Sequence, residues 1–230
     1  MNTQFGGTAA SEEFTEVAFY YDLWRRLANS DGRGTYEEPD WHEGRLYLRS
    51  DYWDKIKEWP QWGAFGDWAA WVIAPMPGGH FRVLRSLKHE RVGQRSEEIT
   101  AIFSRFIDAG KYVILRMGDS LRSDLRLKTL FIQWDDRGLN NQFEVSPAGP
   151  DIIDLLCRAM PTLDKESVER YLKRYTLKSD PDSFAYTFPS EEPRMEVLGL
   201  SFRELTAALL DGMPGSITSM AGFGESQTSN

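Results

Sequence analysis

The sequence predicts an α+β fold, in which a single domain holds a mostly antiparallel sheet flanked by helices. Three observations lead to this fold class. Segments with helical spacing and segments rich in β-branched and aromatic residues follow one another without a regular strand–helix–strand alternation. Turn residues separate neighbouring strand segments, which favours antiparallel pairing. The chain has 230 residues, 41% of them hydrophobic, and is therefore long and apolar enough for one packed core.

The first expected element is a helix that begins after Ser11, because a serine hydroxyl can accept a hydrogen bond from a free amide at a helix start. Residues 29–32 read Asn-Ser-Asp-Gly and are expected to end it. Apolar side chains recur at helical spacing and predict the buried face: Phe14, Val17, Ala18, Tyr21, Trp24 and Ala28. Residues 1–11 are expected to be disordered.

Three short strands are predicted next, at residues 45–49, 69–74 and 80–85, where β-branched, aromatic and leucine residues are frequent. Residues 75–79 read Pro-Met-Pro-Gly-Gly, a turn signal that would let the last two strands pair as a hairpin.

A second helix is predicted over residues 96–109, ending at Gly110 as a C-terminal glycine cap. Its apolar residues recur at the spacing of one buried helical stripe: Ile99, Ile102, Phe103, Phe106 and Ile107. Strands are expected at residues 112–116, 127–134 and 139–145. The turn residues Asp135, Asp136, Arg137 and Gly138 between the last two predict a hairpin.

The C-terminal part is predicted to be mainly helical, with helices at residues 150–160 and 164–175 and a short strand at 184–188. The second of these helices is expected to bury Val168, Tyr171, Leu172 and Tyr175. A last helix at 201–211 opens with a capping box between Ser201 and Glu204. The folded domain is therefore expected to span residues 12–212, with a disordered tail at 213–230.

The charge distribution excludes two classes of partner. The formal net charge is 27 − 35 = −8, and an acidic protein repels nucleic acid and anionic membranes. The sequence therefore predicts neither a nucleic-acid nor a membrane partner. Residues 80–130 are the exception, with 11 basic and 6 acidic residues and a local charge of +5. That segment could face an anionic partner, although a solvated helix surface of mixed charge explains it more simply.

The sequence also predicts the cellular compartment. The chain contains no apolar run of membrane-spanning length, and its first residues lack the pattern of a signal peptide. The single cysteine, Cys157, cannot form an internal disulfide and is expected on the apolar face of a helix. These features predict a cytoplasmic protein.

No catalytic motif stands out, so the sequence predicts a protein that is not an enzyme. The three histidines, His42, His80 and His89, do not have the spacing of metal ligands, and no phosphate-binding or nucleophile motif is present. Adjacent carboxylates such as Asp135 and Asp136 point apart on a regular element and seldom act as a catalytic pair. We therefore expect no cofactor, no metal and no catalytic residue.

Aromatic residues provide the strongest signal for binding. Six of the eight tryptophans lie between Trp41 and Trp71. Most of these rings are expected to fill one end of the core. Trp59, Trp62 and Phe65 are the exceptions, because Pro and Gly interrupt their segment and favour a loop. Substitution of Trp62 by Ala is predicted to weaken partner binding by about 2 kcal/mol. Trp71→Ala is predicted to cost about 3–5 kcal/mol of stability.

The order of elements between residues 80 and 188 resembles that of a known family. The features are a strand ending in Ser86 (80–86), a helix with aromatic residues (99–107) and Gly110, the segment Leu121-Arg122-Ser123, a hairpin (128–146), and paired helices (151–175). This order is similar to that of the immunity proteins that neutralise secreted actinobacterial NAD-glycohydrolase toxins of the necrotizing-toxin type. The chain departs from the family in residues 111–118, in its Trp-rich N-terminal part and in the helix at 201–211.

The resemblance implies a cytoplasmic, non-catalytic α+β protein that binds a toxin domain, encoded by an adjacent gene, and blocks its active site. In this interpretation Trp59, Trp62 and Phe65 are aromatic anchors, and Asp135, Asp136 and Arg137 form a polar rim around them. Two alternatives remain open. One is a chaperone or adaptor of a specialised secretion system, which would bind an extended or helical segment. The other is an enzyme that binds a small molecule in a deep pocket.

Overall fold

An eight-stranded antiparallel sheet is the centre of the fold, with strand order β1-β2-β3-β4-β5-β8-β7-β6. The structure is a computed structural model, and it describes residues 8–30, 36–50, 68–88 and 95–222. The strands are β1 (Asp40–His42), β2 (Arg45–Ser50), β3 (Trp68–Pro75), β4 (Phe81–Lys88), β5 (Arg95–Phe103), β6 (Phe143–Pro147), β7 (Lys173–Leu177) and β8 (Asp180–Thr187). The α+β fold with an antiparallel sheet flanked by helices is thus confirmed.

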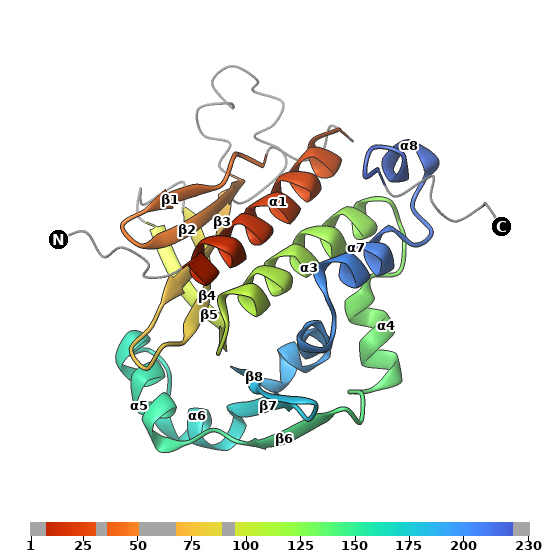
Figure 1. Cartoon of the computed structure of the whole chain (residues 1–230). Helices are drawn as coiled ribbons and strands as arrows, with labels where there is room; N and C mark the ends of the chain where they lie inside the picture. The colour runs from red at the N-terminus through yellow and green to blue at the C-terminus, as the bar shows by residue number, and fades with distance from the viewer. Residues whose placement is uncertain (1–7, 31–35, 51–67, 89–94, 223–230) are drawn as a thin grey trace.

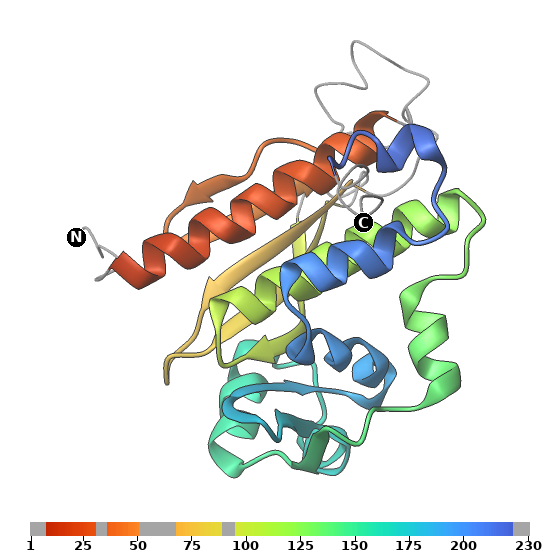
Figure 2. The same ribbon diagram turned by 45° about the vertical axis from the view of Figure 1, so that its right-hand side comes forward.

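Helices cover both faces of this sheet. They are α1 (Thr8–Ser30), α3 (Phe106–Asp124), α4 (Leu130–Arg137), α5 (Pro150–Ala159), α6 (Lys165–Tyr171), the 3₁₀ segment η2 (Pro189–Gly199), α7 (Phe202–Leu210) and α8 (Gly215–Thr218). Helices α1, α3 and α7 lie side by side on one face (Figure 1), and they share one hydrophobic core with that face. Figure 2 shows α5, α6 and strands β6–β8 at the lower end of the molecule. The second core lies on the opposite face, between the sheet and α5 and α6.

The N-terminal elements agree with the sequence predictions. The predicted strands at 45–49, 69–74 and 80–85 correspond to β2, β3 and β4, and β3 and β4 pair as the expected hairpin. Helix α1 begins at Thr8, earlier than predicted, and buries Val17, Tyr21 and Trp24 in the first core.

The helix predicted over 96–109 is wrong, because those residues form β5 and the start of α3. A β-bulge explains the misleading spacing. Opposite the Val83/Leu84 step, Ala101 and Ile99 pair with consecutive residues, so Thr100 is the extra residue of β5. The bulge shifts the alternation of side chains, and Ile99 and Ile102, three residues apart, both face the second core. A bulged strand buried on both faces therefore imitates a helical stripe.

The strand predicted at 112–116 is also wrong, because these residues lie in the middle of α3. Burial on almost every side of α3 explains its run of β-branched and aromatic residues, since packing overrides intrinsic propensity here. Gly110 is not a cap but a point of close contact. A Cβ atom there would lie 2.4 Å from Val17 on α1, and one at Gly118 would lie 2.5 Å from Leu209 on α7. The two glycines let both neighbouring helices approach α3.

The hairpin predicted around residues 135–138 is absent, because residues 127–134 do not form a strand. Thr129 instead caps α4, accepting a hydrogen bond from the amide of Ile132 at 3.2 Å. Gly138, with φ 77°, ends the helix. The chain then enters β6, which pairs with β7 rather than with a preceding strand. The turn residues are therefore a helix end.

In the C-terminal part, α5, β8 and α7 occupy the places predicted for two helices and a strand, and the capping box of Ser201 and Glu204 is present. The helix predicted at 164–175 ends at Tyr171, which is 47% exposed, and β7 follows it. The structure also differs from the tail expected at 213–230: Met213 and Ile217 are buried in the first core. Residues 223–230 lie outside the described part of the chain.

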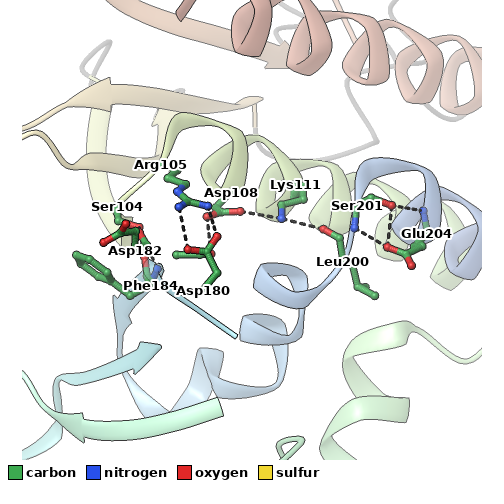
Figure 3. A network of polar contacts seen from close by, with 11 residues as sticks. Ser104, Arg105, Asp108, Lys111, Asp180, Asp182, Phe184, Leu200, Ser201 and Glu204 are labelled. Carbon is green, nitrogen blue, oxygen red and sulfur yellow. Dashed lines mark hydrogen bonds and ion pairs between the residues drawn. The ribbon is translucent and has the colours of Figure 1, made fainter. Parts of the chain in front are cut away.

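The sheet has one narrow junction, between β5 and β8. Only Ile102 with Tyr186 and Phe103 with Ala185 pair across it, whereas β3 and β4 pair over eight positions. Polar side chains reinforce the junction (Figure 3). The Ser104 hydroxyl donates to the carbonyl of Asp182 at 2.7 Å and accepts from the Phe184 amide at 2.9 Å.

On the α3 side of this junction lies a buried group that we call the Asp108 clasp, consisting of Asp108, Lys111 and Ser183. Figure 3 shows Asp108 and Lys111 of this group. Asp108 and Lys111 are 2.7 Å apart, with side chains that are 3% and 8% exposed. The Ser183 hydroxyl of β8 donates to Asp108 at 2.9 Å, and Lys111 donates to the carbonyl of Leu200 at 2.8 Å. The clasp thus joins α3, β8 and the segment before α7.

Candidate functional site

The residues predicted to bind a partner fall into two groups. Trp59, Trp62 and Phe65 lie outside the described residues, so their role stays a prediction. Asp135, Asp136 and Arg137 form the last turn of α4, and all three are exposed. Asp136 pairs with Lys128, and Arg137 lies 3.2 Å from Glu196. The sequence placed them correctly on the surface but on the wrong element.

The N-terminal end of α4 is fixed by a buried carboxylate from α3. Asp119 accepts hydrogen bonds from the amides of Leu130 at 2.7 Å and Phe131 at 3.1 Å. Burial raises the pKa of Asp119 above its usual value, and the two amide hydrogen bonds oppose this shift. The guanidinium of Arg194 lies 3.9 Å from the centre of the Phe131 ring. This end of α4 is therefore held by polar and aromatic contacts.

The C-terminal end of α4 is fixed by Glu196 of η2. This buried carboxylate is 3.2 Å from Arg137 and accepts a hydrogen bond from the amide of Asn140 at 2.8 Å. It therefore holds both the last turn of α4 and the segment that leads to β6. An exposed helix anchored at both ends can present its surface with little loss of conformational entropy on binding.

The exposed side chains of α4 and β6 combine apolar and acidic character. Ile132 and Val145 are each 45% exposed. Asp135 and Asp136 follow Ile132 by one helical turn. We call these four residues the α4–β6 surface: Ile132, Asp135, Asp136 and Val145. Both views show α4 leading through a short segment into β6 (Figures 1 and 2).

Strand β6 is an edge of the sheet, and its hydrogen-bond pattern shows which groups point outward. The Lys178 amide donates to the carbonyl of Gln142, and the Ala148 amide donates to the carbonyl of Leu172. In an antiparallel ladder, these two bonds mean that the backbone groups of Glu144 and Ser146 face β7. The amide and carbonyl of Val145 therefore face away from the sheet.

Trp71 and Trp41 are the described members of the aromatic group that can be compared with the predictions. Trp71 is partly buried against the first core, 6.3 Å from the Tyr112 ring, with the Arg116 guanidinium 4.9 Å from its own ring centre. That position agrees with the expected packing role, and the predicted loss of stability for Trp71→Ala stays a prediction. Trp41 is 37% exposed and packs edge-on against Phe14, with ring centres 5.5 Å apart.

The polar groups near α3 form structural contacts rather than an isolated reactive pair. Glu191 accepts a hydrogen bond from Tyr112 at 2.6 Å and pairs with Arg194 at 3.0 Å and Arg116 at 3.4 Å. Burial is the main reason that the pKa of Tyr112 is raised. In the described part of the chain, no three His, Cys, Asp or Glu side chains are grouped as metal ligands would be. None of the helices described has the length and apolarity needed to cross a membrane.

Sequence reasoning missed the parts of the α4–β6 surface that depend on tertiary contacts. Glu196 was not singled out, because nothing local shows that it reaches two segments more than fifty residues earlier, at Asn140 and Arg137. Ile132 was expected on a strand, where its exposure was not evident. Only the run of Asp135, Asp136 and Arg137 carried a local signal, and that signal was read as a turn.

Comparison with known proteins gives one structural match. The chain is similar to Rv3902c from M. tuberculosis, with 15% sequence identity and a TM-score of 0.48, over 86% of this chain and 88% of that chain. No family model matches the sequence, and neither does any curated protein. Identity and structural agreement at this level carry no conclusion about a site or a partner.

Two features behind the sequence resemblance fold differently from the expectation. Residues 99–107 contain the end of β5 and the start of α3, and residues 128–146 contain α4 and most of β6. Membership of the immunity-protein family therefore stays a prediction from the sequence.

Proposed function

We propose that the protein is a non-catalytic immunity protein, which binds a cognate secreted toxin domain in the cytoplasm and blocks its active site. The α4–β6 surface is the observation that carries this proposal. It combines two exposed aliphatic side chains with two carboxylates on elements that Asp119 and Glu196 hold in place. Protein inhibitors bind through such apolar contacts surrounded by a polar rim.

Charge gives the proposed partner its expected chemistry. The net charge of −8 and the carboxylates of the α4–β6 surface favour a basic surface on the toxin domain, since complementary charges accelerate association. Trp59, Trp62 and Phe65, which lie outside the described residues, would contribute aromatic anchors, as the sequence predicts. The proposal assigns no catalytic residue, metal or cofactor to the chain.

The test is a titration of the purified protein with the toxin domain encoded by the adjacent gene, combined with an assay of NAD cleavage. We expect one-to-one binding and loss of NAD cleavage. Conversion of Asp135 and Asp136 to Asn is expected to slow association by about tenfold at low salt, because rim charges act mainly on the association rate. The matched control converts Glu166 and Glu169 to Gln, which are exposed carboxylates of α6.

The aromatic part of the proposal has its own variant. Trp62→Ala is expected to raise Kd by about thirtyfold, equivalent to about 2 kcal/mol. A toxin domain that remains fully active in an excess of the protein would contradict the proposed function. Turnover of NAD by the protein itself, abolished by substitution of one carboxylate or histidine, would contradict its non-catalytic character.

The exposed edge of β6 specifically favours the chaperone or adaptor alternative. An extended segment could pair with the outward amide and carbonyl of Val145, as in β-strand addition. The two functions differ in the form of the partner that they recognise. A chaperone would bind unfolded segments of the exported protein and leave the activity of the folded toxin domain unchanged, whereas an immunity protein would require the folded domain.

A further inference from the structure

A row of side chains crosses the β5/β8 junction on the face opposite to the Asp108 clasp. In the pairing of the strands, Arg82 lies opposite Ile102, Ile102 opposite Tyr186, and Tyr186 opposite Arg174. Ile102 and Tyr186 belong to the second core, which identifies the face. We call these four residues the arginine row.

Both arginines of this row lack a partner for a buried donor. The Nε atoms of Arg82 and Arg174 are buried and have no hydrogen-bond acceptor among the described residues. Among the described residues, neither guanidinium has an ion-pair partner. Arg45 and Arg194 also have a buried Nε without an acceptor, but their guanidinium groups pair with Glu97 at 2.7 Å and with Glu191 at 3.0 Å. Half-buried guanidinium groups without an acceptor are energetically unfavourable, since each has lost part of its hydration.

Arg174 and His80 approach the aromatic surface of β8 from opposite sides. The guanidinium carbon of Arg174 lies 3.9 Å from the ring centre of Phe184, so this side chain extends from β7 over β8. From the start of β4, the His80 ring reaches to 5.6 Å from Phe184 and 6.1 Å from Tyr186. Arg82 lies two residues after His80 and therefore on the same face of the sheet.

The backbone separation leaves room for a small ligand between the two side chains. Arg82 and Arg174 are three strands apart, which corresponds to about 14 Å at about 4.8 Å per strand. Arg174 extends over β8, so its charged end lies closer to β4 than its backbone does. Guanidinium groups bind phosphate and carboxylate oxygens through paired N–H donors.

From these observations, we infer that the arginine row binds a small oxyanion, a phosphate or carboxylate group, across the β5/β8 junction through Arg82 and Arg174. Arg82 belongs to the basic segment at residues 80–130. A small ligand fits better than a nucleic acid, because the net charge of −8 opposes a large polyanion. This site is separate from the α4–β6 surface and does not depend on the proposed function.

Bound oxyanion would connect β4 to β7 where the sheet itself has only two pairs of residues. A ligand that binds the folded state alone raises the stability of that state in proportion to the logarithm of its concentration. The ligand would therefore strengthen the junction on the face that the Asp108 clasp does not reach.

The test uses the full-length protein and three probes at matched ionic strength: inorganic phosphate, pyrophosphate and succinate. Thermal melting and calorimetric titration report binding. We expect the midpoint of melting to rise with at least one probe. Comparison of the rise in phosphate with the rise in succinate shows whether the site binds a phosphate or a carboxylate group. Arg82→Gln and Arg174→Gln should each weaken binding by about tenfold or more, since each removes a charge-assisted contact. Arg158→Gln, on the exposed side of α5, is the matched control.

Two further measurements keep the inference falsifiable. Arg82→Lys keeps the charge and should therefore retain part of the affinity. If Arg82→Gln lost binding only because it misfolds, keeping the charge would not restore binding. The NMR signals of His80 should shift on addition of the ligand in the wild type and not in Arg174→Gln. The inference is overturned if no probe raises the melting midpoint above a chloride control, or if both Gln variants bind like the wild type.

Discussion

The two faces of the β5/β8 junction differ in how their buried charged side chains are paired. On the α3 face, Asp108 and Lys111 are almost fully buried, and Ser183 and the Leu200 carbonyl satisfy their remaining hydrogen bonds. On the other face, Arg82 and Arg174 are only half-buried, yet each has a buried donor without an acceptor in the described residues. The charged side chains on the α3 face have their partners within the chain, whereas each arginine on the other face has one buried donor without an acceptor among the described residues.

This difference separates a structural role from a binding role. A buried ion pair whose members all have partners cannot gain anything from a ligand, and its loss leaves an uncompensated charge. Unpartnered buried donors lower the stability of the free protein and can gain an interaction when an acceptor arrives. Substitutions on the two faces should therefore have different consequences.

The largest effect is expected for Asp108→Ala. It leaves Lys111 buried without its counter-charge and removes the acceptor for Ser183, so we expect a loss of about 3–5 kcal/mol in the free energy of unfolding. Urea denaturation followed by circular dichroism measures this loss. Asp154→Ala is the control, because the ion pair of Asp154 with Lys165 is exposed and its removal should change stability little. Equal losses for the two variants would contradict the structural role of the clasp.

Replacement of the whole ion pair sharpens this test. In the double variant Asp108→Leu with Lys111→Met, no buried charge is left unpaired, so it should recover a large part of the stability lost in Asp108→Ala. The same urea titration gives the interaction energy between the two positions. A double variant less stable than either single variant would show that the hydrogen bonds to Ser183 and Leu200 matter more than the charges.

A smaller effect of opposite sign is expected on the other face. Arg82→Met removes a half-buried charge that has no ion pair among the described residues but keeps the apolar part of the side chain, so stability should be unchanged or rise by up to about 1 kcal/mol. Arg174→Met also removes the contact of the guanidinium with the Phe184 ring, so its gain should be smaller. Urea denaturation in a buffer without phosphate or carboxylates measures this difference. A loss of 2 kcal/mol or more, on the order of a broken hydrogen-bonded charge, would mean that these arginines have partners within the protein.

The smallest effect concerns the pH dependence of His80. Burial first, and Arg174 second, lower the pKa of His80 below its usual value. The folded state therefore prefers the neutral ring, and its stability falls as the pH decreases below about 6.5, where the unfolded chain takes up the proton more readily. In Arg174→Met, one of the two causes is removed, so the pKa should move upward. An NMR titration of His80 in both proteins measures the shift, and an unchanged pKa would place Arg174 too far away to matter.

Local signals were sufficient where an element depends on its own sequence. Ser201 and Glu204 identify the start of α7, and the Pro-Gly turn at 75–79 identifies the β3–β4 hairpin. The predictions from the sequence were wrong where contacts with another helix or strand decide the local structure. The bulge at Thr100 gave β5 a helical spacing, and packing against α1 and α7 placed Gly110 and Gly118 inside a helix.

The same distinction applies to the candidate sites. Asp135, Asp136 and Arg137 were identified because three consecutive charged residues are visible in the sequence itself. The contact of Glu196 with Arg137, the Asp108 clasp and the arginine row each join segments that are distant in the sequence. Their residues carry no local pattern, since a pairing across a sheet is fixed only when both strands are in register.

The edge of β6 has a further consequence for how copies of this protein behave beside one another. Its outward groups are unequal: Pro147 has no amide hydrogen, and the Phe143 amide already donates to Asn140 at 3.1 Å. Val145 is thus the single amide of β6 that is turned outward, while the carbonyls of Phe143, Val145 and Pro147 remain as acceptors. Two such edges can supply each other with only one donor each, so chains at high concentration should not stack into ladders through β6. A foreign strand with a full set of amides meets no such restriction.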